Sequence, residues 1–119
     1  MSTLASIVIA AIALLHVYIL VLEMFLWDKP AGLRTFAQTR EEATASKVLA
    51  ANQGLYNGFL AAGLFWGLSL GAAGSGVKIF FLSCVLIAGV YGAASTGIRR
   101  ILFIQAVPAA VALALLLLS

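Results

Sequence analysis

The sequence predicts an all-α fold: a polytopic four-helix bundle whose helices cross a membrane in antiparallel, up-and-down order. Two observations predict it. Of the 119 residues, 64% are hydrophobic and only 9% are charged, and the mean hydropathy is +1.14. Soluble domains carry roughly a quarter charged residues. Because membrane-length segments use nearly the whole chain as one transmembrane domain, the composition excludes a separate soluble catalytic domain.

Four apolar segments are long enough to predict membrane crossings, since about 18 apolar residues begin to suggest a spanning helix. They cover residues 3–27, 48–70, 79–97 and 101–118. The first segment lacks a basic region ahead of it, so we expect a retained helix rather than a cleaved signal peptide.

The polar loop over residues 28–47 contains signals for local helix. Thr35 with Gln38, and Thr39 with Glu42, match the spacing of a capping box. Pro30 predicts a break after the first crossing. We therefore expect a helix that starts near Thr39 and continues into the second crossing.

The basic residues predict the orientation in the membrane. The formal net charge is +3, and the four-crossing topology puts six of the seven Lys and Arg residues on one side: Lys29, Arg34, Arg40, Lys47, Arg99 and Arg100. The positive-inside rule makes this side cytoplasmic and places both termini outside the cytoplasm. The basic residues form no stripe with exposed aromatic residues, so the expected partner is the lipid bilayer and not nucleic acid.

The first crossing contains His16, Glu23 and Trp27, spaced by seven and four residues, which predicts one shared helix face. An ionisable group inside a spanning helix is costly unless it faces protein or water, which makes Glu23 the most informative residue. It either serves a ligand or pairs with a basic residue such as Lys47. His16 is interpreted either as a packing residue or as a proton carrier.

The second crossing begins with Asn52, Gln53, Tyr56 and Asn57, which share a helix face about 140° wide. Small residues occupy the opposite face at Gly54, Gly58, Ala61 and Ala62, and a second small-residue stripe follows at Gly63, Gly67 and Gly71. Such stripes predict close helix packing, whereas the polar face predicts either a binding surface or interhelical hydrogen bonds.

The last two crossings add polar residues at the same cytoplasmic depth, and Pro108 predicts a bend in the fourth. We therefore expect one polar pocket open to the cytoplasm. Its candidate ligand-binding residues are Glu23, Asn52, Gln53, Tyr56, Asn57, Tyr91, Arg99, Arg100 and Gln105. The candidate supporting residues are His16, Trp27 and Ser95. The lone Cys84 has no neighbours at metal-ligand spacing, so neither a disulfide nor a metal site is expected.

A family resemblance rests on the run from His16 to Trp27, the stretch from Lys47 to Ala62 that contains Asn-Gln-Gly-Leu-Tyr-Asn-Gly, and Gln105 with Pro108. These segments resemble the bacterial membrane proteins grouped as domain of unknown function 1304, over essentially the whole chain. The resemblance implies a four-helix integral protein of the bacterial inner membrane, and it implies no particular activity.

Three functions remain open. The first is a ligand-binding or transport-accessory bundle, as a single chain or a homo-oligomer, that holds a small polar or anionic molecule. The second is an enzyme, because the layout distantly resembles the membrane-associated proteins in eicosanoid and glutathione metabolism. That family places Arg, Asn and Glu together on its second helix, where this chain has Asn52, Tyr56 and Asn57. The third is a structural subunit whose polar residues fix helix register.

Overall fold

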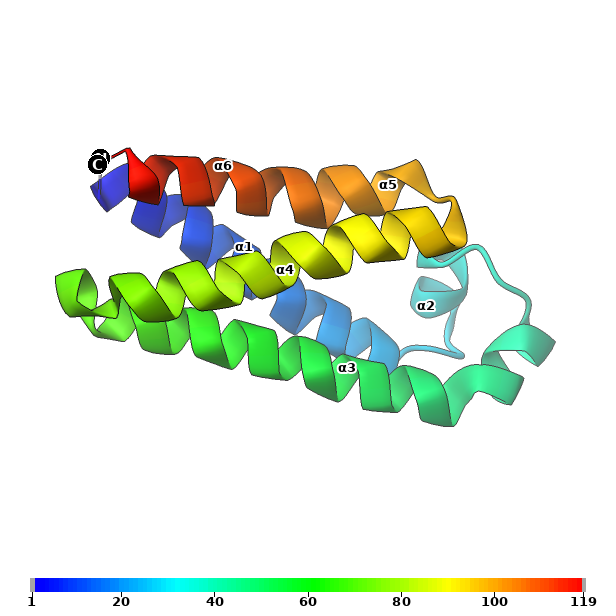
Figure 1. Cartoon of the computed structure of the whole chain (residues 1–119). Helices are drawn as coiled ribbons and strands as arrows, with labels where there is room; N and C mark the ends of the chain where they lie inside the picture. Colours follow the sequence, from blue (N-terminus) through cyan, green and yellow to red (C-terminus); the bar gives the residue numbers. More distant parts are fainter. Residues whose placement is uncertain (1, 119) are drawn as a thin grey trace. The chain divides into compact units, whose positions relative to one another are not determined.

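The chain is all-helical. The structure, a computed structural model, describes residues 2–118 and contains no strand among them (Figure 1). In chain order the elements are α1 (Ser2–Met24), α2 (Pro30–Thr35), α3 (Arg40–Ser69), the 3-10 turn η1 (Gly71–Gly74), α4 (Ser75–Thr96), α5 (Arg99–Ile101), the π-helical segment η2 (Leu102–Ala106) and α6 (Val107–Leu117).

Three helical stretches are long and apolar enough to cross a membrane, judged by length and composition. They are Thr3–Met24, Gly71–Thr96 and Arg99–Leu117. The sequence predicted four such helices, and α3 does not meet the same criterion. The physical reason is its cluster of amide side chains at Asn52, Gln53 and Asn57, which lowers the hydropathy of its apolar stretch.

The described residues form two compact units. One contains the residues up to Ala13 together with those from Leu60 onward, and the other is Leu14–Phe59. α1 and α3 therefore each contribute one part to each unit.

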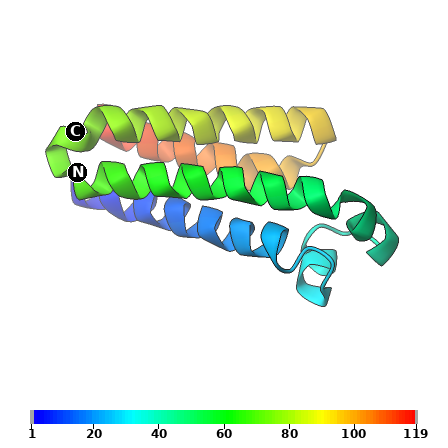
Figure 2. The ribbon, with the colours of Figure 1, turned by 90° about the horizontal axis from the view of Figure 1, so that it is seen from below.

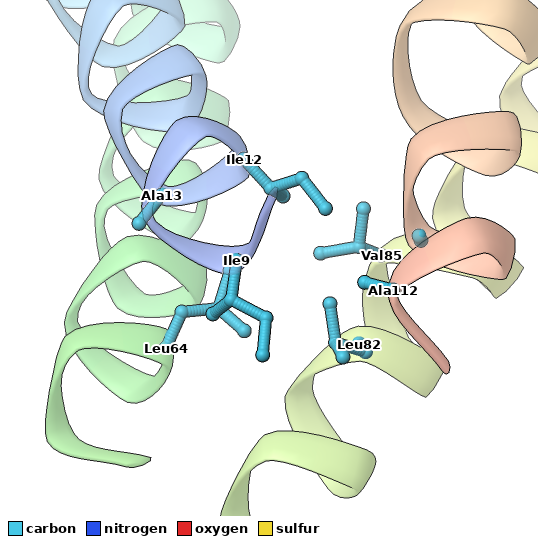
Figure 3. Packing of buried hydrophobic residues seen from close by; sticks show 8 residues of the cluster. Ile9, Ile12, Ala13, Leu64, Leu82, Val85 and Ala112 are labelled. Carbon is cyan, nitrogen blue, oxygen red and sulfur yellow. The ribbon is translucent and has the colours of Figure 1, made fainter. Parts of the chain in front are cut away.

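The first unit has an apolar core that draws on α1, α3, α4 and α6. Its fully buried side chains include Ile9, Leu64, Leu82 and Val85 (Figure 3). Small residues on α6, such as Ala112, let it approach α4, and α4 runs beside η2 and α6 in both views of the ribbon (Figures 1 and 2).

The second small-residue stripe was predicted to pack closely against another helix, and two of its three glycines do so within this unit. A Cβ atom at Gly63 would collide with the ring of Phe81, and one at Gly67 would lie 2.8 Å from Cγ of Lys78. Gly71 differs, because its φ of 60° begins the turn after α3 and no atom lies near its absent side chain.

Just before Pro108, where the sequence predicts a bend, the helix contains a π-helical segment, η2. The N–H of Val107 donates to the carbonyl of Leu102, a bond over five residues instead of four. Proline has no N–H and its ring crowds the preceding turn, so the helix before Pro108 widens. Gly89 on α4 accommodates this segment, since a Cβ there would lie 2.6 Å from the backbone nitrogen of Ala106.

The second unit confirms one of the two predicted capping boxes. The N–H of Glu42 donates to Thr39 Oγ1 at 3.1 Å, and the N–H of Thr39 donates to Glu42 Oε1 at 2.7 Å. As predicted, the helix starting there continues without interruption through the polar face of α3. The prediction of a box at Thr35 is wrong, because its hydroxyl donates to the carbonyl of Ala31 at 2.7 Å inside α2.

Candidate polar site

A hydrogen bond between Glu23 and Asn57 is the centre of the candidate site. Asn57 Nδ2 donates to Glu23 Oε1 at 2.6 Å, and both side chains are half-buried. Glu23 lies in the last turn of α1, and Asn57 lies in the middle of α3. The bond therefore links the two long helices of the second unit.

Gly54 explains why α3 approaches α1 closely at this point. A Cβ atom on Gly54 would lie 2.6 Å from Cγ of Met24 and 3.1 Å from Cβ of Glu23. One turn further along α3, a Cβ on Gly58 would lie 2.6 Å from Cδ1 of Leu20. The predicted packing role of the first small-residue stripe is confirmed at these two glycines.

The pair has unused hydrogen-bond acceptors. Asn57 Nδ2 also donates to the carbonyl of Gln53 at 3.2 Å, so the two hydrogens of its amide are engaged. Among residues 2–118, Oε2 of Glu23 and Oδ1 of Asn57 accept no hydrogen bond. An incoming group with N–H or O–H donors matches these two oxygens.

The side chains of the other three polar residues predicted on this face of α3 form no hydrogen bond with this pair among the described residues. Asn52, Gln53 and Tyr56 are exposed, and the exposed fraction of Tyr56 is 51%. Gly54, which contacts α1, lies two residues before Tyr56, about 160° away around the helix. Of the four polar residues predicted on this face, Asn57 is the one whose side chain forms a hydrogen bond with Glu23 among the described residues.

Of the two residues predicted to share the helix face of Glu23, His16 lies with it in α1 and Trp27 does not. His16 is fully buried in α1. α1 ends at Met24, so Trp27 lies in the following turn and does not continue the helix face of Glu23. Its indole Nε1 donates to Ser46 Oγ at 3.1 Å, and its ring packs on Phe36 at a centroid distance of 4.8 Å.

The alternative partner considered for Glu23, a basic side chain such as Lys47, is engaged elsewhere. Lys47 Nζ donates to Asp28 Oδ2 at 3.0 Å. This hydrogen bond lowers the pKa of the Asp28 carboxyl, with added attraction from the charges of Lys47 and Lys29. The roles of Asp28 and Ser46 could not be predicted from the sequence, since a bond across 19 residues depends on the folded path of the loop.

The remaining predicted site residues belong to the first unit. Tyr91, Arg99 and Arg100 are exposed, and Gln105 is half-buried within η2. Ser95 Oγ donates to the carbonyl of Gly92 at 3.4 Å on its own helix.

Two further observations limit the chemistry of the described residues. No group of three His, Cys, Asp or Glu residues among them is placed to hold a metal ion. A shallow surface hollow of about 490 Å³ is lined by Thr3, Ser6, Ile7, Ala10 and Leu68, none of which is a predicted site residue.

The fold and this site define a class: an all-helical protein compatible with multiple membrane crossings, with a carboxylate–amide pair between α1 and α3. The chain belongs to the family described as protein of unknown function (DUF1304), whose profile matches residues 10–117. The family predicted from the sequence is thereby confirmed.

A bacterial relative supports the same assignment. The chain is 30% identical to the uncharacterized protein YpaA of Lactococcus lactis subsp. lactis over 104 residues, which is 86% of this chain and 87% of the relative. No solved structure matches the chain.

Proposed function

We propose that this protein lies in the bacterial inner membrane and binds a small polar ligand at Glu23 and Asn57, in a binding or transport-accessory role. The observation that carries the proposal is the 2.6 Å hydrogen bond that holds the two side chains together and leaves Oε2 and Oδ1 as neighbouring acceptors. A carboxylate fixed by one hydrogen bond is oriented before a ligand arrives, which lowers the cost of binding.

The proposal includes α3 as a fourth membrane crossing. Its 30 residues extend about 45 Å, which exceeds a bilayer core of about 30 Å. The pairing of Asn57 with Glu23 reduces the cost of placing both polar groups at membrane depth. Four crossings put both termini outside the cytoplasm and six of the seven basic residues inside.

Two reporter insertions test this topology. A reporter after Ala37 in the loop should give a cytoplasmic signal, whereas one after Ala72 in η1 should give an external signal, because α3 lies between them. A third reporter, fused after Ser119, should also be external. The same side for the first two reporters would show that α3 does not cross, and a cytoplasmic signal after Ser119 would reverse the orientation.

Ligand binding is tested by native mass spectrometry of the purified protein. The parent should retain a small molecule, and Glu23→Gln should lose it because the amide offers one acceptor where the carboxylate offers two oxygens. Glu41→Gln is the matched control, since Glu41 is exposed in the first turn of α3 and lies outside the Thr39 capping box. A parent without bound molecule, or equal occupancy in both variants, would contradict the proposal.

A structural role is the second candidate, and the same hydrogen bond favours it because that bond joins α1 to α3 next to Gly54. In that case Glu23→Gln should change the free energy of unfolding by about 0.5–1.5 kcal/mol or less while no molecule is retained by either protein. Measuring stability and occupancy on the same samples separates the two roles.

A further inference from the structure

One face of α3 combines exposed apolar and exposed polar side chains. Leu49, Tyr56 and Phe59 have exposed fractions of 74%, 51% and 55%, and Asn52 is exposed between them. The spacing of Leu49, Asn52, Tyr56 and Phe59 is three, four and three residues, which is the seam spacing of two packed helices. We call these four residues the α3 seam.

The α3 seam faces away from the rest of its unit. Ala43, Ala50 and Gly54 are buried on the other side of the helix, where Gly54 contacts α1. At about 100° per residue, Asn52 lies about 160° from Gly54 around the helix axis. Nothing in the second unit therefore covers Asn52.

The amide of Asn52 makes this exposure informative. Its side chain has no hydrogen-bond partner among residues 2–118, and the same holds for the adjacent Gln53 side chain. If α3 crosses the membrane as proposed above, a free primary amide would face hydrocarbon, which offers neither donors nor acceptors. A protein surface with matching donors and acceptors is the stable alternative.

We propose that the α3 seam binds the α3 seam of a second copy of this chain, with the two α3 helices parallel. This inference rests on the proposed membrane crossing of α3 and is independent of ligand binding at Glu23. It assigns Asn52 to an interface between copies instead of to the ligand site.

Self-complementarity is the reason for choosing a second copy as the partner. A primary amide carries both donors and an acceptor, so two Asn52 side chains satisfy one another, which two carboxylates or two ammonium groups would not do. A membrane gives every copy the same orientation, and a twofold axis along the membrane normal then brings each residue to the depth of its own counterpart. Asn52 would meet Asn52 between layers of Leu49 and Tyr56, as a buried Asn does in a parallel two-helix seam.

Disulfide scanning in native membranes tests the seam. In a Cys84→Ser background, the four single variants Leu49→Cys, Asn52→Cys, Tyr56→Cys and Phe59→Cys are oxidised and the crosslinked dimer is quantified. Ala51→Cys and Phe65→Cys are the controls, because at about 100° per residue both lie about 80° or more around the helix from every seam residue. Ala51 is half-buried, and the exposed fraction of Phe65 is 39%. We expect several-fold more crosslinked dimer at the seam positions than at the controls.

Three results would overturn the inference. Equal crosslinking at seam and control positions would indicate random collisions, and absence of crosslinking at all four seam positions would indicate a lipid-facing surface or a different partner. A protein that is monomeric in native mass spectrometry at all concentrations would also overturn the inference.

A substitution separates this inference from the proposed ligand site. Asn52→Leu should lower the dimer fraction yet leave molecule retention at Glu23 unchanged, whereas Glu23→Gln should abolish retention and leave crosslinking at Tyr56→Cys unchanged. A dimer fraction unaffected by Asn52→Leu would remove the amide from the interface. Failure of ligand binding alone would leave the crosslinking pattern intact.

Discussion

Asn57 Nδ2 lies 2.6 Å from Glu23 Oε1, although the two residues are 34 positions apart in the chain. We expect this bond to couple the two side chains energetically. In a double-mutant cycle of Glu23→Ala and Asn57→Ala, the coupling in the free energy of unfolding should be about 0.5–1.5 kcal/mol. Unfolding in detergent, followed by circular dichroism, provides the measurement.

A cycle between Glu23→Ala and Asn52→Ala is the control for this experiment. Asn52 faces away from Glu23, so the two effects should add to within about 0.5 kcal/mol. Equal coupling in both cycles would mean that the Glu23–Asn57 bond has no specific contribution.

Close approach of α3 to α1 at Gly54 leads to a second prediction. Gly54→Leu should lower the free energy of unfolding by about 1–3 kcal/mol, because its side chain would overlap Met24 and Glu23. The midpoint of thermal unfolding in detergent measures the effect. Gly76→Leu is the matched control, since no atom lies within 4 Å of a Cβ at Gly76; equal losses in both variants would contradict the packing argument.

The capping box at the start of α3 leads to a third prediction. Thr39→Ala removes the acceptor for the N–H of Glu42 and should destabilise the first turn of α3 by about 1 kcal/mol. Hydrogen exchange at the amides of Glu42 and Ala43 should become faster. Thr44→Ala is the matched control, because Thr44 is exposed in the same helix and makes no side-chain hydrogen bond among the described residues. In this control, hydrogen exchange at the amides of Glu42 and Ala43 should stay at the parental rate.

The ion pair of Asp28 and Lys47 leads to a fourth prediction, on pH. Because the folded protein lowers the pKa of Asp28, the pair stabilises the fold fully above the ordinary pKa of an aspartate, and this contribution disappears as the pH falls through the lowered pKa. In Lys47→Gln the pKa of Asp28 should rise toward its ordinary value. Carboxyl NMR titration of parent and variant measures this, and identical titration curves would show that Lys47 is not the cause.

The helical class and much of the local structure could be predicted from the amino-acid sequence. The apolar segments predicted helices, the Thr39–Glu42 spacing predicted the start of α3, and Gly54 and Gly58 predicted the side of α3 that approaches another helix. These features depend on residues within one helical turn of each other or on a face that the helical period defines, so they can be read without knowing the rest of the chain.

Which polar groups form hydrogen bonds with one another depends on how the helices pack. Helical periodicity placed Asn52, Gln53, Tyr56 and Asn57 on one broad face, but only the rotation of α3 against α1 shows that Asn57 reaches Glu23 and that Asn52 does not. The pairing of Lys47 with Asp28 and of Trp27 with Ser46 depends on the path of the chain after Met24. Such contacts arise from the packing of segments distant in sequence, and local spacing does not encode them.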